Sequence, residues 1–330
     1  MQTRMLGGVA VPAIGLGCMN LSHAYGTPPD AGAAGALLNA ALDAGCTHLD
    51  TAALYGFGAN EELLGRAIGH RRGEFFLASK CGTFRNAEGK REIDGRPEVL
   101  RRTCEGALQR LRTEVIDLYY LHRWDRRVPI EESIGALAEL VAAGKVRALG
   151  LSEVSAATLR RAHAVHPIAA LQSEYSLWTR NPEIAVLDAC RELGISFVAF
   201  SPLGRGFLSG AVTDPTRFEA GDLRRNMPRF APDNFARNLP LVQACAGIAR
   251  ELGCSMAQLA LAWVLARGDD ILPLPGTTRI DHLHDNLAAG GVRLSAEVHA
   301  RLEALFDRHA VHGGRYGAAT QAEVDTEEFA

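Results

Sequence analysis

Short apolar segments alternate with longer amphipathic segments along most of this chain, and this repeat constrains the fold more than any other feature. The apolar segments have no polar face, which is typical of strands buried on both sides of a parallel sheet. The amphipathic segments have helical spacing; PEVLRRTCEGALQRL at 97–111, for example, starts with a proline and keeps apolar residues three or four positions apart. Eight such units are present, with apolar segments at residues 13–19, 47–52, 75–82, 115–122, 146–152, 168–175, 196–201 and 270–276.

Eight strand-then-helix units in 330 residues predict an α/β protein with a closed (β/α)8 TIM barrel. An open doubly wound sheet has the same alternation and stays an alternative, because closure is not visible in a sequence. No linker rich in proline, serine or charge divides the chain, so we expect residues 1–330 to form a single barrel domain. Outside the repeat we expect an N-terminal extension, long loops at 83–96 and 203–238, an inserted helix near 239–252, and a C-terminal tail after Leu294.

Composition argues against several classes of partner. A net charge of -3 gives no broad attraction to nucleic acid or acidic lipid, and no segment is long and apolar enough to be a signal peptide or to span a membrane. The 7 cysteines never form a C-x-x-C pair, which indicates a reducing compartment without disulfides or structural zinc. The 11 histidines show no metal-ligand spacing. We therefore expect a cytoplasmic protein without a metal site, a nucleic-acid partner or a membrane partner.

Polar or aromatic residues stand where the predicted strands end. In (β/α)8 barrels the active site is built at the carboxyl ends of the strands, so these side chains would share one mouth. Any one of them alone would more often be structural, but together they include an acid, an amine, a phenol and an imidazole. The residues are Asp50, Tyr55, Lys80, His122, Ser152, Glu153, Gln172, Phe200 and Ser201.

Four of these residues can form one proton-transfer device. A free phenol has a pKa of about 10, and a neighbouring ammonium such as that of Lys80 would lower the pKa of Tyr55. Asp50 would pair with Lys80 and fix it, and the His122 imidazole could hydrogen-bond an acceptor oxygen. Together these four residues would form a general acid beside an oxyanion pocket, an arrangement that suits the reduction of a carbonyl.

The motifs that carry these residues resemble those of the aldo-keto reductases, which are NADPH-dependent oxidoreductases built on a (β/α)8 barrel. The matching segments, in chain order, are LDTAALYG, ASKCG, DLYYLHRWD, GKVRALGLSEVS, LQSEYSLWTR, AFSPLGRGFLSG and LPLPGTTRIDHLHDNL. They cover nearly the whole chain, and the YYLHR segment resembles a bacterial, yeast and plant branch of the family.

The resemblance implies roles for the four residues of the device. Tyr55 would donate the proton, Lys80 would tune its pKa, Asp50 would anchor Lys80, and His122 would orient the substrate carbonyl. The substrate would be a small-molecule aldehyde or ketone, reduced by direct hydride transfer. Trp124, which follows the fourth predicted strand, could wall an apolar substrate pocket.

The resemblance also implies a binding site for NADPH or NADP+. Ser152, Glu153 and Gln172 would hold the nicotinamide carboxamide, although a carboxylate can accept a hydrogen bond and cannot donate one. Arg279 would be the cation for the 2′-phosphate, because some relatives have Lys where this chain has Gly276; NADH therefore stays an alternative cofactor. The implied contacts are Gly17, Met19, Asp50, Ser152, Glu153, Gln172, Phe200, Ser201, Leu203, Arg205, Gly276, Thr277, Thr278, Arg279, Asp285 and Asn286.

Several alternatives remain open from the sequence. A binding or regulatory protein on the same barrel, as in the potassium-channel β subunits that resemble this family, would bind the cofactor with little turnover. An isomerase could use Lys80 as a Schiff base, provided that Lys80 were free of Asp50. Arg123 and Arg126 could attract an acidic substrate, but we expect them to form surface salt bridges with Asp125 or Glu131. Nothing in the sequence predicts an oligomer.

Overall fold

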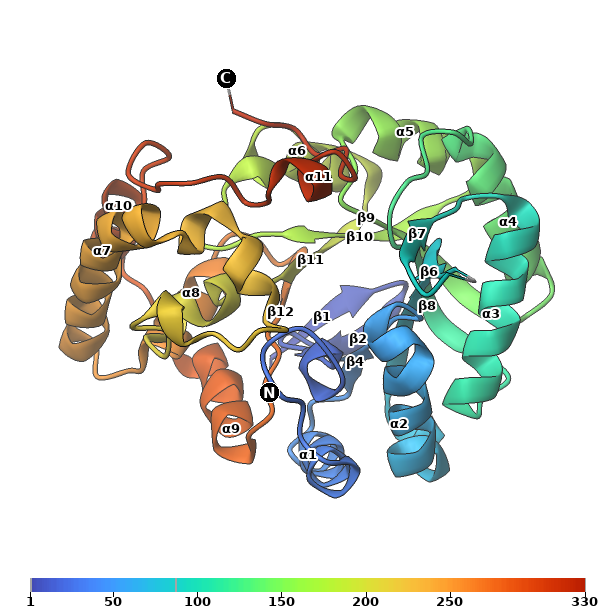
Figure 1. The fold of residues 1–330 in the computed structure, drawn as a ribbon, viewed down its shortest axis with the longest axis horizontal. Helices are drawn as coiled ribbons and strands as arrows, with labels where there is room; N and C mark the ends of the chain where they lie inside the picture. Colours follow the sequence, from blue (N-terminus) through green and yellow to red (C-terminus); the bar gives the residue numbers. More distant parts are fainter. Residues whose placement is uncertain (1, 87, 330) are drawn as a thin grey trace.

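A sheet of eight parallel strands forms the centre of the molecule, and helices surround it (Figure 1). The computed structural model describes residues 2–86 and 88–329. The sheet order is β12-β11-β10-β9-β8-β5-β4-β3, so sheet strands that are consecutive in the sequence are also neighbours in space. Their bounds are β3 (Leu16–Gly17), β4 (His48–Asp50), β5 (Phe76–Cys81), β8 (Ile116–Leu121), β9 (Val146–Ser152), β10 (Ile168–Glu174), β11 (Ser196–Phe200) and β12 (Ile271–Leu274).

Backbone hydrogen bonds connect the two outermost strands of this sheet. The amide of Gly15 donates to the carbonyl oxygen of Pro273 at 3.1 Å, and the amide of Gly17 donates to that of Pro275 at 3.0 Å. These bonds bring the first strand against the last, so the sheet closes on itself. The prediction of a (β/α)8 barrel is confirmed, and the open doubly wound sheet is wrong.

A helix follows each strand of the barrel sheet, and α7 is an addition to the eight-fold repeat. The helices are α1 (Ala31–Asp43), α2 (Ala59–Ile68), α3 (Pro97–Leu111), α4 (Ile130–Ala142), α5 (Ala156–Val165), α6 (Val186–Leu193), α7 (Pro232–Glu251), α8 (Met256–Leu265), α9 (Ile280–Ala288), α10 (Ala296–Leu305) and α11 (Ala318–Gln321).

In the described part of the chain no single helix is both long and apolar enough to cross a membrane; α7 and α8 meet that test only together, with a bend of 87° between them.

The strands are buried on both faces, which explains their continuous apolar sequences. Ala78 and Leu118 belong to a core inside the barrel, whereas Leu77 and Tyr119 pack with the surrounding helices. Successive side chains on a strand point to opposite faces, so each strand contributes to both cores. Gly150 leaves room for a large neighbour inside the barrel, because a Cβ there would lie 2.4 Å from the ring of Tyr120.

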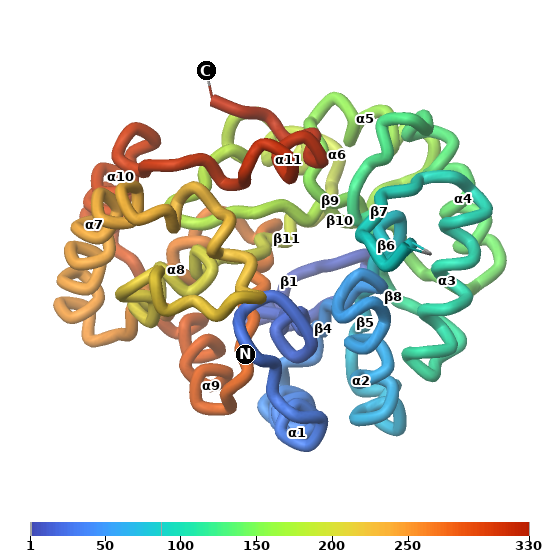
Figure 2. The backbone as a smooth tube through the Cα atoms, in the orientation of Figure 1, coloured from blue at the N-terminus to red at the C-terminus, as the bar shows by residue number. Residues whose placement is uncertain are grey.

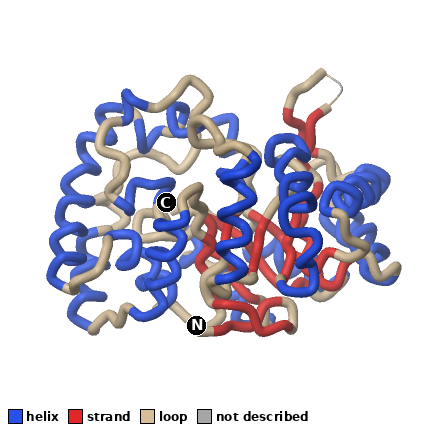
Figure 3. Tube along the Cα trace, turned by 90° about the horizontal axis from the view of Figure 1, so that it is seen from below, coloured by secondary structure: helices blue, strands red, loops and turns tan. Residues whose placement is uncertain are grey.

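The N-terminal extension is a hairpin that covers the amino-terminal end of the barrel. Its strands are β1 (Thr3–Leu6) and β2 (Val9–Pro12), and Leu6 and Val11 belong to the interior core. Arg4 donates to the Leu265 carbonyl oxygen at 2.7 Å. A second hairpin lies at the opposite end of the barrel (Figure 3). The active site therefore has to be built at the end that the first hairpin leaves open.

Three of the predicted additions to the repeat contain more regular structure than we expected. The loop at 83–96 forms the second hairpin, with strands β6 (Thr83–Arg85) and β7 (Arg91–Ile93). The helix expected near 239–252 begins earlier, with Pro232 in its first turn, and continues through Pro240. The segment that follows α10 runs across the molecule to α11, beside α6 (Figure 2).

Close packing of α2 against α3 leads to a testable prediction. A Cβ at Gly65 would lie 2.2 Å from the Arg110 carbonyl oxygen, whereas a Cβ at Gly135 in α4 meets nothing within 4 Å. We expect Gly65→Ala to lower the free energy of unfolding by about 1–3 kcal/mol through overpacking. Gly135→Ala should raise it by up to about 1 kcal/mol through helix propensity. Denaturant unfolding of both variants checks this, and equal effects of the two substitutions would contradict it.

Candidate active site

Asp50, Lys80 and Tyr55 form one buried cluster at the carboxyl ends of β4 and β5. The ammonium of Lys80 forms an ion pair with the carboxylate of Asp50. Lys80 Nζ also donates to the Thr51 carbonyl oxygen at 2.9 Å and lies 3.2 Å from the Tyr55 hydroxyl oxygen. The structure therefore brings together the acid, the amine and the phenol that we selected from the sequence.

The path of the chain between β4 and α2 positions Tyr55. Tyr55 begins the 3-10 helix η2 (Tyr55–Gly58), in which Gly56, Phe57 and Gly58 have φ values of 57°, 52° and 97°. These left-handed residues turn the chain sharply, and glycine adopts such a conformation without strain. Asn60, which is fully buried, accepts a hydrogen bond from the Thr51 hydroxyl at 2.6 Å and so ties the turn to the end of β4.

Burial and charge keep the phenol protonated. Burial raises the pKa of Tyr55, and the opposing effect of Lys80 does not cancel it, so the pKa is above the ordinary value. Lys80 lowers this pKa, as we expected, but desolvation of the phenolate is the larger effect, so the net shift is upward. Burial lowers the pKa of Lys80, but Asp50 and Tyr55 together raise it above its ordinary value. The cluster holds a neutral phenol beside a cationic amine.

His122 follows β8 directly and completes the cluster. Its ring centroid lies 5.8 Å from that of Tyr55, with the two rings nearly perpendicular at 87°. Burial, followed by the charges of Arg123 and Lys80, lowers the pKa of His122 well below its ordinary value. The imidazole is therefore neutral, and among the described residues its buried Nδ1 has no hydrogen-bond partner. A neutral imidazole can donate one hydrogen bond to an oxygen placed beside the Tyr55 hydroxyl.

The three residues expected to hold the nicotinamide carboxamide lie at the ends of β9 and β10, but their partners differ. Gln172 Nε2 donates to Asp50 at 2.9 Å, which links this group to the Lys80 cluster. Ser152 Oγ accepts a hydrogen bond from Arg123 at 3.3 Å. Both carboxylate oxygens of Glu153 accept hydrogen bonds from Arg315, at 2.9 and 2.6 Å. Ser152 and Gln172 therefore still have hydrogen-bonding groups available for an amide ligand, whereas both carboxylate oxygens of Glu153 are already bonded to Arg315.

Arg205 belongs to a buried charge cluster that includes the C-terminal tail. Its guanidinium pairs with Glu174 at 2.8 Å and lies 3.2 Å from the Tyr316 hydroxyl oxygen. Arg315 lies 3.6 Å from Glu174, and Arg229 lies 4.0 Å from it. Burial raises the pKa of Glu174, but Arg205, Arg315 and Arg229 together lower it to about 2. With Glu153 included, three cations face two carboxylates here, which leaves an excess of positive charge.

The segment expected to bind the adenosine end leads into α9. Thr277 and Arg279 precede its first residue, Ile280, so the amino-terminal end of the helix dipole faces this segment. The Arg279 guanidinium is exposed and pairs with Asp281 at 2.5 Å. Asp285 accepts hydrogen bonds from Ser255 and Gln258 at 2.7 and 2.8 Å, and so joins α9 to the start of α8.

The remaining predicted cofactor residues lie along the same side of the mouth. Phe200 ends β11 with its ring half-buried, and Ser201 follows with a φ of 49°. A Cβ at Gly276 would lie 3.1 Å from the Gly17 carbonyl oxygen, so the two loops approach closely here and a side chain would require a small shift. Others at or near this edge are Met19 and Leu203, both half-buried, Thr278, which is exposed, and Asn286, which is buried.

The structure bears on two sequence-based expectations about the segment after β8, and it corrects the first. The carboxylate of Asp125 pairs with Arg127, and that of Glu131 pairs with Arg161, so neither binds Arg123 or Arg126. The Trp124 indole donates to the Val128 carbonyl oxygen at 3.0 Å and faces the Arg161 guanidinium. Trp124 therefore packs toward α5, and its role as a substrate contact stays a prediction without support from its contacts.

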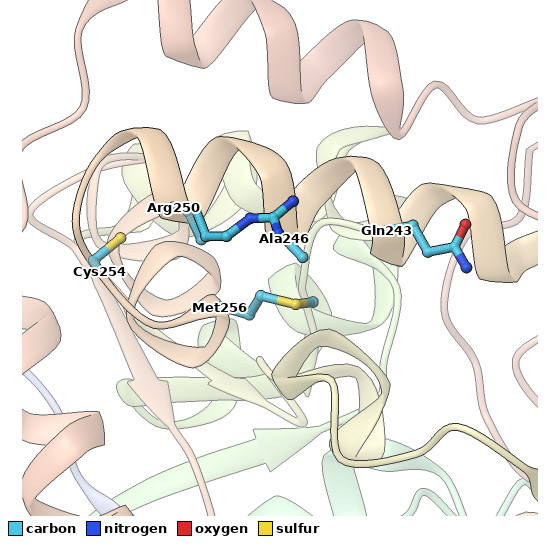
Figure 4. A pocket seen from close by; sticks show the side chains of 6 residues that line it. Gln243, Ala246, Arg250, Cys254 and Met256 are labelled. Carbon is cyan, nitrogen blue, oxygen red and sulfur yellow. The ribbon is translucent and has the colours of Figure 1, made fainter.

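Two cavities lie outside the Asp50-Lys80-Tyr55 cluster. One of about 390 Å³ lies between α7 and the start of α8, and Arg250, Cys254 and Met256 are among its lining residues (Figure 4). Another, of about 260 Å³, lies beside η2 and is lined in part by Ala53 and Phe57. Within residues 2–86 and 88–329, no three His, Cys, Asp or Glu side chains are grouped to hold a metal ion.

Sequence reasoning missed three residues that shape the site: Asn60, Glu174 and Arg315. Glu174 lies within a motif that we quoted and Asn60 lies just beyond another, but a buried carboxylate and a buried amide have no distinctive sequence signal. Arg315 is 162 positions from Glu153, in a segment that we described only as a tail. Its pairing depends on how the tail folds back over the barrel.

A closed (β/α)8 barrel with a Tyr-Lys-Asp cluster and a neutral histidine at its mouth is the arrangement of a barrel enzyme whose site can donate a proton to a bound oxygen. Comparison with known proteins identifies the family. The aldo/keto reductase family model matches residues 13–307. The chain belongs to the aldo/keto reductase family and is an NAD(P)H-dependent oxidoreductase.

Individual relatives agree with this assignment. The aldo-keto reductase yakc [NADP(+)] of Schizosaccharomyces pombe is 46% identical over 98% of this chain and 97% of its own length. The glycerol dehydrogenase AKR11B4 from Gluconobacter oxydans has a TM-score of 0.85 and 31% identity, covering 93% of this chain and 95% of that one. An aldo-keto reductase from Klebsiella pneumoniae in complex with NADPH has a TM-score of 0.72 and 30% identity, covering 92% and 95%.

A buried histidine below the cluster predicts a pH dependence of stability. His48 is fully buried in β4, and among the described residues neither of its ring nitrogens has a partner. Burial lowers its pKa to about 4. Below about pH 6.5 the histidine of the unfolded chain binds a proton that the folded chain excludes. The folded state therefore loses free energy of unfolding at this residue as the pH falls from about 6.5 toward 4, and has no such loss above that range.

We expect His48→Leu to lessen the loss of stability between pH 7 and pH 5 by about 2 kcal/mol. Urea unfolding at the two pH values measures this. His70→Gln, which removes an exposed histidine, should keep the wild-type dependence. An unchanged loss in His48→Leu would show that His48 is not the responsible group.

Proposed function

We propose that this enzyme reduces an aldehyde or ketone to the alcohol with NADPH, and that Tyr55 is the general acid. The observation that carries the proposal is the buried cluster in which Lys80 contacts both Asp50 and the Tyr55 hydroxyl. The raised pKa of Tyr55 keeps the proton available on the phenol, and the ammonium beside it stabilises the phenolate left by proton transfer.

Each residue of the cluster has a distinct task in this proposal. The substrate carbonyl oxygen lies between the Tyr55 hydroxyl and the His122 imidazole, which orients it by a hydrogen bond. Bound NADPH supplies the hydride that adds to the carbonyl carbon. Tyr55 transfers its proton to the oxygen as negative charge develops there, and solvent later returns a proton to Tyr55. Asp50 keeps Lys80 charged and in place throughout.

The residues present fit such a cofactor. Ser152 and Gln172 offer a hydroxyl and an amide for the carboxamide, and the half-buried ring of Phe200 offers a face for stacking. The excess positive charge around Arg205 suits a pyrophosphate. The first turn of α9, with the exposed Arg279 beside it, suits a phosphate group. NADP(+) and NADPH appear in the names of the yeast and Klebsiella relatives, which supports the same choice here.

The first test replaces the acid. Tyr55→Phe should lower the rate of NADPH oxidation with an activated aromatic aldehyde by about 10²–10⁴-fold, because the general acid is lost. NADPH binding, followed by fluorescence, should be retained. The matched control is Tyr119→Phe, whose hydroxyl is fully buried in β8 outside the barrel interior and should be dispensable.

Two other results would overturn this assignment. Equal slow rates in the wild type and Tyr55→Phe, with NADPH bound by both, would favour a binding or regulatory protein on the same barrel. A substrate adduct trapped on Lys80 by borohydride would favour Schiff-base chemistry instead. The contact between Lys80 and Asp50 counts against the second alternative, which needs a free amine.

A second test addresses the choice between NADPH and NADH. Arg279→Gln should raise the KM for NADPH by about tenfold and leave that for NADH nearly unchanged, because only NADPH has a 2′-phosphate. Arg293→Gln removes an exposed cation just after α9 and is the control. If the two KM values change together in Arg279→Gln, Arg279 does not read the 2′-phosphate.

A further inference from the structure

Arg123 is a buried cation without a carboxylate partner at the mouth of the barrel. It follows His122 directly and is only 9% exposed. Its Nη1 donates to the His122 carbonyl oxygen at 2.6 Å and to Ser152 Oγ at 3.3 Å. Within the described ranges it forms no salt bridge, and its buried Nε has no hydrogen-bond partner.

The carboxylates around the mouth are all engaged elsewhere. Asp50 pairs with Lys80, and Asp125 pairs with Arg127. Glu153, the nearest acid along β9, accepts two hydrogen bonds from Arg315. Because each of these three carboxylates is paired with another cation, none of them compensates the positive charge of Arg123.

A buried, unpaired guanidinium is unfavourable unless an anion reaches it, because burial removes hydration that no protein group replaces. A guanidinium also matches the planar, two-oxygen geometry of a carboxylate. We propose that Arg123 binds the carboxylate of the substrate, so that the enzyme prefers carbonyl compounds that carry an acidic group. This inference rests on the proposed function and specifies the substrate class of the same site.

The position of Arg123 distinguishes this role from cofactor binding. Arg123 follows His122 directly and donates to its carbonyl oxygen, so the guanidinium is near the imidazole that would orient the substrate carbonyl. The cations that suit the cofactor phosphates are a different set, which includes Arg205 in the 3-10 helix after β11 and Arg279 before α9. Arg123 lies instead directly after β8, bonded to the His122 carbonyl oxygen and to Ser152 Oγ, beside the reacting end of the proposed cofactor site rather than beside its phosphates.

The test compares two aldehydes that differ in charge, 4-carboxybenzaldehyde and its neutral methyl ester. The wild type should have the higher kcat/KM for the acid. In Arg123→Gln the ratio of the two kcat/KM values should fall by about tenfold or more, with the loss mainly on the acid. Arg123→Lys, which keeps the charge, should retain part of the preference. Arg127→Gln, whose side chain is 69% exposed, removes the same charge and should leave the ratio unchanged.

The outcomes separate this proposal from the proposed function. A ratio that is the same in the wild type and Arg123→Gln would overturn the assignment of Arg123 while leaving carbonyl reduction intact. Weaker NADPH binding in Arg123→Gln with an unchanged ratio would assign Arg123 to the cofactor. An equal fall of the ratio in Arg127→Gln would show a general effect of net charge. Absence of turnover with both aldehydes in the wild type would contradict the proposed function itself.

Discussion

The buried ion pair between Lys80 and Asp50 is the interaction on which the rest of the site depends. Each residue would be strongly destabilising alone, because an unpaired charge in this position costs about 3–5 kcal/mol. The pair joins two neighbouring strands, and it leaves Lys80 with hydrogen-bonding capacity that reaches the Tyr55 hydroxyl. Gln172 donates to the same Asp50 from β10, so the pair also connects Tyr55 with the opposite wall of the barrel.

Positive charge is distributed around this pair in two places. One is the cluster of Arg205, Arg229 and Arg315 around Glu174 and Glu153, to which the C-terminal tail contributes through Arg315 and Tyr316. The other is Arg123, which has no carboxylate partner among residues 2–86 and 88–329. With the acidic substrate that we propose, the reductase has to attract two anions, cofactor and substrate, without allowing them to compete. Separate cationic regions on different strands meet that requirement.

Much of the fold and the reactive residues could be predicted from the sequence. The alternation of apolar and amphipathic segments reflects strands buried on both faces, and it places Asp50, Lys80 and His122 at strand ends. Once these ends are known, parallel strands bring them to one edge. The turn at 56–58, the start of α7 and the two hairpins were not predicted, because they depend on local backbone conformation and on packing that has no periodic signal.

The sequence by itself determined the barrel, the chemical identity of the cluster and its common location, because periodicity and residue type are local properties. The tertiary structure decided which charges are paired. Arg123 lies two positions from Asp125 and yet does not bind it, whereas Arg315 binds Glu153 across 162 residues. It also decided the sign of the Tyr55 pKa shift, since burial outweighs the neighbouring ammonium. Pairing and desolvation depend on distances in space and on the exclusion of water, and neither quantity is a function of separation along the chain.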